Sequence, residues 1–346
     1  MASIATPRGA SALALALALA AYLLAPPGGD AAAHLYQTQV WRQHGWRLWD
    51  NFWYAGRYSQ VNYSLLYYPL AALLGTAPVV CGSAAGAAAA FAQLVRRQWP
   101  TLAIGPSAAF AALIPLAVLA GTYPFLLALA LGLATLAAAQ AGRYRLALAA
   151  TAATALAHPL ALVFLAAFLA GIAASSRGWW RRRGALLFAG GVVAIGAAQA
   201  IALRAFAASG AYYPFDLRDA LAIAGFCAVG AALSWRVPGQ RPLPALFACY
   251  GAVATAAWLV PSPIGSNAVR LLLLMGTPLL LVPLAARHFR PRVLTVACLA
   301  GALLWQALPA VAGWRAATGA RASAESFWYP VEAFLDRHHD PAYRVE

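Results

Sequence analysis

The apolar stretch LALAATAATALAHPLALVFLAAFLAGIAA, residues 146–174, decides how this chain folds. It is longer than the roughly 20 residues that one membrane-spanning helix needs, and His158-Pro159 interrupts it. As a single helix it would place Arg143 and Arg145 on the opposite side of the membrane from Arg181–Arg183, against the bias of arginine toward the inner side. A residue before proline is also disfavoured in helical geometry. The stretch therefore predicts two short spans that meet at His158 on the outer side.

The composition places the whole chain in the membrane class. Of its 346 residues, 63% are hydrophobic and 10% are charged, whereas about 25% of the residues in soluble domains are charged. The net charge of +15 would suggest nucleic acid in a soluble protein, but arginines that flank membrane spans explain it, so no nucleic-acid partner is expected. The four cysteines stand apart, and GxGxxG, GxxxxGK[ST] and HExxH are missing, so nucleotide hydrolysis and zinc-protease chemistry have no support.

Working outward from residues 146–174, we predict an all-α integral membrane protein of about eleven transmembrane helices, with the N-terminus inside and the C-terminus outside. Residues 1–311 form the polytopic membrane domain, and residues 312–346 form an outer tail that resembles the start of a soluble domain. The first apolar run, residues 10–25, could instead be a signal peptide cleaved near Ala31-Ala32-Ala33. We favour a retained span because many spans follow it.

Charged residues segregate under this topology. Fourteen arginines fall on the inner side: Arg8, Arg96, Arg97, Arg143, Arg145, Arg177, Arg181, Arg182, Arg183, Arg236, Arg241, Arg287, Arg290 and Arg292. The 9 acidic residues, which were not used to assign the topology, all fall on the outer side: Asp30, Asp50, Asp216, Asp219, Glu325, Glu332, Asp336, Asp340 and Glu346. Any carboxylate chemistry is therefore expected on the outer face.

The first outer loop, residues 27–65, is the candidate active-site loop. Asp30 follows the first span and could act as the N-cap of a helix, as a general base or as a metal ligand. His34 lies one helical turn later and so faces the same way, although two ligands do not complete a site for a divalent metal such as Mg²⁺ or Mn²⁺. Residues 31–44 predict a short amphipathic helix in the membrane interface that ends at Gly45.

Other polar residues of the outer face are candidates for binding. Asp50 could bind a sugar hydroxyl or stabilise a turn, and the tryptophans around it could be interfacial anchors or a platform for a sugar. Arg270, at the mouth of a span, could reach to the interface or bind a phosphate through its guanidinium group. His158 could be a satisfied polar residue at a helix break or a binding residue.

Several short motifs follow one another along the chain: Asp30-x3-His34, Trp49, Tyr54-Ala-Gly56-Arg57-Tyr58, Tyr68-Pro69-Leu70, Gly121-Thr-Tyr-Pro-Phe125, His158-Pro159-Leu160 and Gly265-x-Asn267-x-x-Arg270-Leu271. Their order resembles the lipid-carrier-dependent glycosyltransferases of the GT-C fold, closest to bacterial relatives with Asp-x3-His after the first span. A doubled acidic motif seen in several members is missing here. Residues 312–346 are also shorter than the soluble C-terminal domain of the relatives.

The resemblance implies a bacterial plasma-membrane enzyme of the cell envelope that transfers a sugar from a polyprenyl-phosphate donor, with its active face outward. Asp30 matches the acidic residue that deprotonates the acceptor hydroxyl. Arg270 or Arg57 matches the cation that stabilises the departing polyprenyl phosphate. The predicted substrate-binding residues are His34, Asp50, Trp53, Arg57, Tyr58, His158 and Arg270.

Two other functions stay open. A secondary transporter or lipid flippase would also span the membrane many times, but the sequence shows no clear repeat and no carboxylate inside a span. A non-catalytic membrane subunit or degenerate relative is the third interpretation. The long, aromatic-rich first outer loop favours an enzyme over a transporter.

Overall fold

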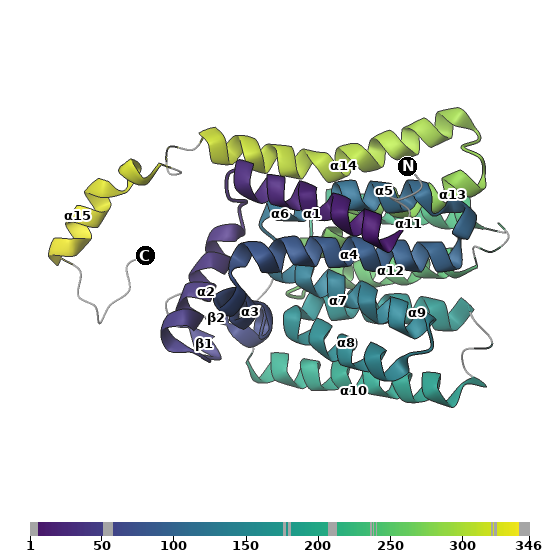
Figure 1. Ribbon diagram of the computed structural model, residues 1–346, viewed down its shortest axis with the longest axis horizontal. Coiled ribbons are helices and arrows are strands. Elements are labelled where there is room, and N and C mark those ends of the chain that lie inside the picture. Colours follow the sequence, from purple (N-terminus) through teal and green to yellow (C-terminus); the bar gives the residue numbers. More distant parts are fainter. Residues whose placement is uncertain are drawn as a thin grey trace.

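The computed structural model describes residues 6–50, 58–175, 178, 181–206, 213–235, 237, 239, 241–319, 321 and 324–338. This part of the chain is almost entirely helical, which confirms the predicted all-α class (Figure 1). The exception is a two-residue antiparallel ladder in which β1 (Trp49–Asp50) pairs with β2 (Tyr58–Ser59), with Trp49 opposite Ser59 and Asp50 opposite Tyr58.

Eight helical segments in the described ranges are long and apolar enough to cross a membrane. They are α1 (Pro7–Leu24), α4 (Thr76–Gln98), α7 (Tyr123–Gln140), α10 (Arg183–Ala205), α11 (Leu217–Ser234), α12 (Pro242–Leu259), α13 (Arg270–Ala286) with the turn η6 (Gly265–Val269) before it, and α14 (Arg292–Gly319). These helices are compatible with a multi-pass membrane protein. The α14 helix continues past residue 311, where we expected the last span to end.

Shorter helices complete the fold. Apolar helices of less than a full span are α5 (Ile104–Leu113) with α6 (Leu116–Ala120), α8 (Tyr144–Ala157) and α9 (Pro159–Ser175). The remaining elements are α2 (Ala31–His44), α3 (Tyr67–Leu74), α15 (Tyr329–His338), η3 (Gln60–Asn62), η4 (Pro100–Leu102) and η8 (Glu325–Phe327). The predicted total of about eleven spans and their orientation stay predictions.

The break within residues 146–174 lies where the sequence places it. Helix α8 ends at Ala157, His158 is extended with φ −166° and ψ 123°, and α9 begins at Pro159. Residue 158 is extended because the proline ring excludes helical geometry from the residue before it. The backbone amides of Leu65 and Leu66 donate to the carbonyl oxygen of Leu156, which fastens the first loop to this break.

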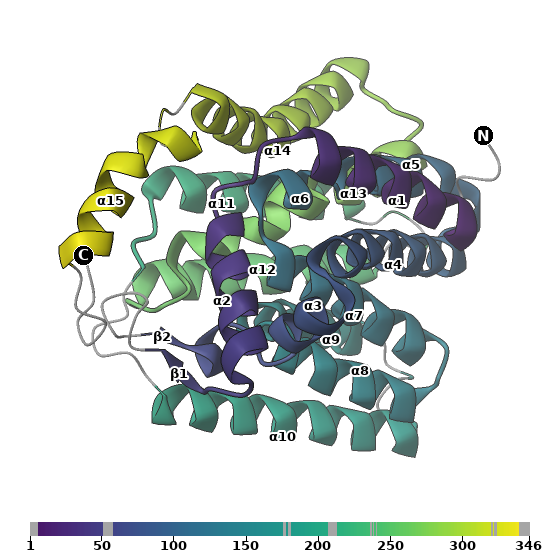
Figure 2. The same ribbon diagram turned by 60° about the vertical axis from the view of Figure 1, so that its left-hand side comes forward.

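The long helices lie side by side, and α2, α3 and the two strands gather at one end of them (Figure 1). We call this end the Asp30 end, because Asp30 lies between α1 and α2 there. Figure 2 shows α2 lying across this end of the bundle. The opposite end, where α4, α7 and α13 finish, is the arginine end: it carries Arg96, Arg97, Arg143, Arg145, Arg181, Arg182 and Arg183.

Helix α2 has the predicted bounds but turns its polar face inward. Gly45 ends it with a φ of +66°, as the sequence indicates. His34, Gln37 and Thr38 are buried, whereas Leu35 is 45% exposed. We expected an amphipathic helix with an apolar buried face, and the observed face is polar because the end of the bundle below it carries tyrosines and charged groups.

Candidate functional site

The backbone of Asp30 is held against the turn between α6 and α7. Its amide donates to the carbonyl oxygen of Ala120 at 3.5 Å. The next residue in that turn, Gly121, has a φ of +77°, and a Cβ atom there would lie 2.5 Å from the amide nitrogen of Ala31. Only glycine allows both this conformation and this approach, since a side chain disfavours positive φ. The Gly121 turn therefore fixes where Asp30 lies.

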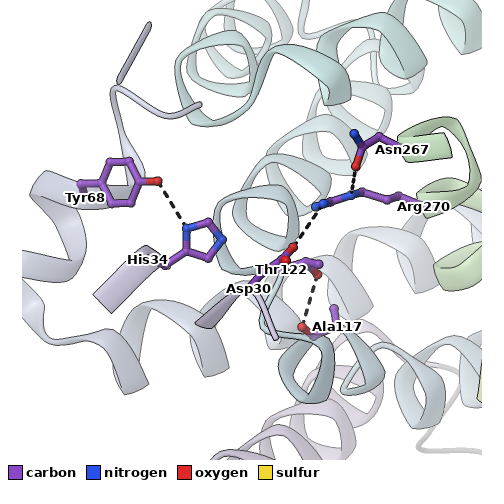
Figure 3. Close-up of polar contacts among 7 residues, drawn as sticks. All are labelled: Asp30, His34, Tyr68, Ala117, Thr122, Asn267 and Arg270. Atoms are coloured by element: carbon purple, nitrogen blue, oxygen red, sulfur yellow. Dashed lines mark hydrogen bonds and ion pairs between the residues drawn. The ribbon is translucent and has the colours of Figure 1, made fainter. Parts of the chain in front are cut away.

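The side chain of Asp30 pairs with Arg270, which lies 240 positions later in the chain. The distance from Asp30 Oδ2 to Arg270 Nη2 is 3.2 Å (Figure 3). Asp30 precedes α2 as its N-cap residue, but its carboxylate makes no capping hydrogen bond. The N-cap interpretation of its side chain is therefore wrong. The carboxylate pairs with the charged guanidinium group of Arg270 instead of capping the helix.

Arg270 is itself held in place on two sides. Its Nε donates to Asn267 Oδ1 at 2.9 Å (Figure 3), and its guanidinium carbon lies 5.9 Å from the centre of the Phe125 ring. Asn267 lies in η6, whose first residue, Gly265, packs its Cα against the backbone carbonyl of Tyr213. Two of the five N–H donors of the guanidinium group are thus engaged, which leaves the others for an incoming anion.

His34 lies beside the ion pair and is almost completely buried, with 1% of its surface exposed. Its Nδ1 lies 3.3 Å from the hydroxyl oxygen of Tyr68 (Figure 3). Burial, followed by the charge of Arg270, lowers the pKa of His34 from 6.5 to about 3, so the imidazole is neutral at ordinary pH. Its Nε2 is buried and has no hydrogen-bond partner among the described residues.

Aromatic rings surround His34 and connect it to His158. The His34 ring lies 5.3 to 6.1 Å from four tyrosine rings, those of Tyr63, Tyr67, Tyr68 and Tyr123. The ring of Tyr63 also lies 5.5 Å from that of His158, edge to face. The Nδ1 of His158 accepts a hydrogen bond from the amide of Leu160 at 3.2 Å, so a neutral His158 carries its proton on Nε2.

Asp50 belongs to the first loop and not to this cluster. Its Oδ2 accepts a hydrogen bond from Gln37 Nε2 at 2.9 Å, and its side chain is buried between β1 and α2. After the effect of burial, the Asp50 carboxylate raises the pKa of Tyr36, because a negative charge nearby disfavours the phenolate. These contacts favour the turn-stabilising role of Asp50 over sugar binding.

The other predicted binding residues cannot be placed in the same way. Trp53 and Arg57 lie outside the described residues. For Tyr58 only the backbone is described, in β2 opposite Asp50. The sequence did not single out Asn267, Tyr63, Tyr67 and Tyr123 as site residues, although Asn267 and Tyr123 occur inside the quoted motifs.

A metal ion does not fit the residues of this cluster. Asp30 faces Arg270, and His34 Nδ1 faces the hydroxyl of Tyr68. Within the ranges that the structure describes, no group of three His, Cys, Asp or Glu side chains lies close enough to hold a metal ion. A divalent cation needs several oxygen or nitrogen ligands at once, and here one of the two candidates is already neutralised by a guanidinium group.

Comparisons with protein-family models, with curated proteins and with solved structures find no match to this chain. The chemistry of the site must therefore be inferred from its own residues. A carboxylate can accept a proton, a guanidinium group can bind phosphate, and neutral histidines and tyrosines can hydrogen-bond hydroxyl groups. The cluster is suited to an anionic substrate that also carries hydroxyl groups.

An apolar groove runs along the bundle close to this cluster. It lies between α11 and α12, has a volume of about 430 Å³ and includes Leu217, Leu221, Cys227, Phe247 and Trp258. Both helices also pack against η6, which contains Asn267 and ends at the residue before Arg270. Leu217 and Trp258 mark the end of the groove at the Asp30 end, since α11 begins and α12 finishes there. A volume of this size falls within the usual range of ligand sites, roughly 300–1,000 Å³.

Proposed function

We propose that this protein is a membrane glycosyltransferase that transfers a sugar from a polyprenyl-phosphate donor to an acceptor on the outer face of the membrane. The observation that carries the proposal is the 3.2 Å contact between Asp30 and Arg270. The two residues that the resemblance assigns to proton transfer and to phosphate binding come from opposite parts of the chain. Their proximity is what a shared reaction centre requires.

The proposed transfer needs one base and one cation. The Asp30 carboxylate takes the proton of the acceptor hydroxyl as the acceptor oxygen bonds to the anomeric carbon. The bond between that carbon and the phosphate oxygen breaks, and the polyprenyl phosphate leaves with the electron pair. Arg270 stabilises the charge that develops on the leaving group. Because Arg270 also holds Asp30, the arriving phosphate competes for the guanidinium group and releases the carboxylate for its role as base.

The neighbouring rings supply polar contacts for a sugar. His34 Nε2, which lacks a hydrogen-bond partner among the described residues, is a candidate partner for a sugar hydroxyl, and the tyrosines offer flat apolar faces with polar edges. His34 is neutral, so it contributes a hydrogen bond without adding a second positive charge beside Arg270. These contacts support sugar binding next to the phosphate.

The groove between α11 and α12 supports a donor with a lipid tail. Its lining is mostly apolar, and the end of the groove at Leu217 and Trp258 lies at the same end of the bundle as Arg270. A polyprenyl chain in this groove would bury apolar surface at roughly 25 cal/mol per Å² while its phosphate reached Arg270. A soluble nucleotide-sugar donor would leave the groove without a role.

The test is donor cleavage by the purified protein in lipid nanodiscs, supplied with polyprenyl-phosphate sugars. Asp30→Asn should lower turnover by about 10²-fold or more, since general-base assistance typically contributes 10²–10⁴-fold. Asp216→Asn is the matched control, because Asp216 is an acidic residue at the Asp30 end that precedes α11. It should leave turnover unchanged.

Two results would contradict the proposal. Equal turnover in wild type and Asp30→Asn would remove Asp30 as the base. Movement of the intact donor across vesicles, with no cleavage by any variant, would favour a transporter or flippase.

A further inference from the structure

A second cavity lies at the arginine end of the bundle, away from the ion pair. It has a volume of about 290 Å³ and is formed by α4, α7, α9, α12 and α13. Its deep part is apolar, with Phe91, Leu133, Phe168 and Met275 among its residues. The mechanism proposed above does not use this cavity.

The mouth of this cavity is polar and cationic. Gln98, Gln140, Ser175 and Arg182 line it, and all of them lie at the ends of helices or just beyond them. Arg96, Arg97, Arg143 and Arg145 lie at the same end of the bundle. The sequence contains no acidic residue between Asp50 and Asp216, so the segments that form most of this mouth carry no carboxylate.

We propose that this cavity binds one acyl chain of an anionic phospholipid, with the lipid phosphate at Arg182. An apolar interior below a cationic, carboxylate-free mouth is complementary to such a lipid in both shape and charge. One water molecule occupies roughly 30 Å³ of liquid, so the cavity has room for on the order of ten groups of that size, which suits a segment of a single chain.

The function proposed above places the sugar donor at the other end of the bundle. Its phosphate belongs at Arg270, near the opposite end of α13. The space between the two regions is a cavity of about 30 Å³ whose walls include Leu133, Phe168 and Met275, which also line the larger cavity. The volume of that space is about a tenth of the volume of the larger cavity. The lipid site thus lies near the end of α13 opposite Arg270, and the exclusion of the sugar donor from it rests on the function proposed above.

Native mass spectrometry of the detergent-purified protein tests the site, with phosphatidylglycerol and phosphatidylcholine of identical chains as probes. Wild type should retain one phosphatidylglycerol in preference to phosphatidylcholine. Arg182→Gln should weaken retention about fivefold, since one arginine near a lipid headgroup contributes about 1 kcal/mol. Arg145→Gln is the control, because Arg145 is exposed at the same end and does not line the cavity.

A cavity-filling variant tests the chain-binding part separately. Ala139→Trp should abolish retention because Ala139 lines the cavity, whereas Ala134→Trp, at another partly buried position of the same helix, should not. Circular dichroism checks that each variant is folded. If Ala139→Trp is not folded, the smaller Ala139→Leu takes its place. Equal retention of the two lipids, equal weakening by Arg182→Gln and Arg145→Gln, or preferential retention of polyprenyl phosphate would each overturn the proposal.

Discussion

At the scale of single residues, the pairing of Asp30 with Arg270 raises the question of whether it serves stability or chemistry. The Asp30 side chain is 41% exposed, and ion pairs with this much solvent access typically contribute about 0.2–1 kcal/mol. Loss of the pair therefore costs little folding free energy. A large loss of activity in a variant that replaces Asp30 or Arg270 would have to come from the reaction itself.

A charge exchange separates the two roles. The double variant with Asp30→Arg and Arg270→Asp keeps an ion pair between the same positions, so its melting temperature should lie within a few degrees of that of wild type. Its donor turnover should nevertheless stay at least 10²-fold low, because base and cation have exchanged places. Thermal unfolding and donor cleavage, measured on the same preparations with both single variants, check this. Full activity in the exchanged protein would show that the pair is structural.

The buried His34 predicts a pH dependence of stability. Its pKa is about 3 in the folded protein and 6.5 in a free side chain, so the unfolded chain binds more protons between these values. The free energy of unfolding should fall as the pH falls below about 6.5, with a slope of at most about 1.4 kcal/mol per pH unit from this residue. Chemical denaturation from pH 7 to pH 4 measures the slope.

Replacing His34 provides the comparison. His34→Asn should remove its share of the slope, whereas His44→Asn should not, because His44 is exposed near the end of the same helix. An identical pH slope in wild type and His34→Asn would show that the burial of His34 does not control acid sensitivity.

The sequence reveals some of these residues but not their partners. Asp30, His34 and Arg270 can be proposed from residue type and from their places beside apolar runs. The pairing of Asp30 with Arg270 cannot, because contacts between positions 240 apart depend on how the helices pack. For the same reason the capping role predicted for the Asp30 carboxylate is wrong: local spacing does not reveal a guanidinium group that arrives from another helix.

At the scale of structural elements, the turn between α6 and α7 positions the site through Gly121. Gly121→Ala adds a Cβ atom 2.5 Å from the amide nitrogen of Ala31 at a φ of +77°. Strain at positive φ costs about 1–2 kcal/mol, and the contact should also displace Asp30. We expect a lower melting temperature and a loss of turnover beyond what unfolding explains.

Gly142→Ala is the matched control for this turn. Gly142 has a similar φ of +71°, but a Cβ atom there meets no atom within 4 Å. It should lower the melting temperature without changing turnover per folded molecule. If both variants lose activity to the same extent, the Gly121 turn does not position Asp30.

The ends of helices can be predicted from the sequence where a nearby residue determines them. The break at His158 and the end of α2 at Gly45 are set by a proline and a glycine, and both predictions are confirmed. The inward orientation of the polar face of α2 cannot be predicted from the sequence in this way. Hydrophobic periodicity assumes an apolar interior, and α2 covers the one end of the bundle where the described neighbours of His34 are tyrosines and a charged pair.

At the scale of the whole molecule, the two ends of the bundle predict how the protein sits in its membrane. With the four native cysteines changed to alanine, Gln39→Cys on the exposed side of α2 should react with a membrane-impermeant maleimide in intact cells. Arg145→Cys, exposed at the arginine end, should react only after the cells are opened. The reverse pattern would place the Asp30 end inside and contradict an outward active face.

The separation of charge between the two ends has an electrical consequence. The seven described carboxylates belong to the Asp30 end or to the segments beyond α14: Asp30, Asp50, Asp216, Asp219, Glu325, Glu332 and Asp336. Moving one elementary charge through a potential of 100 mV changes its energy by about 2.3 kcal/mol. In an energised membrane that is negative inside, the field therefore favours drawing the arginine end inward, so a cell that loses its membrane voltage also loses one of the forces that orient this chain.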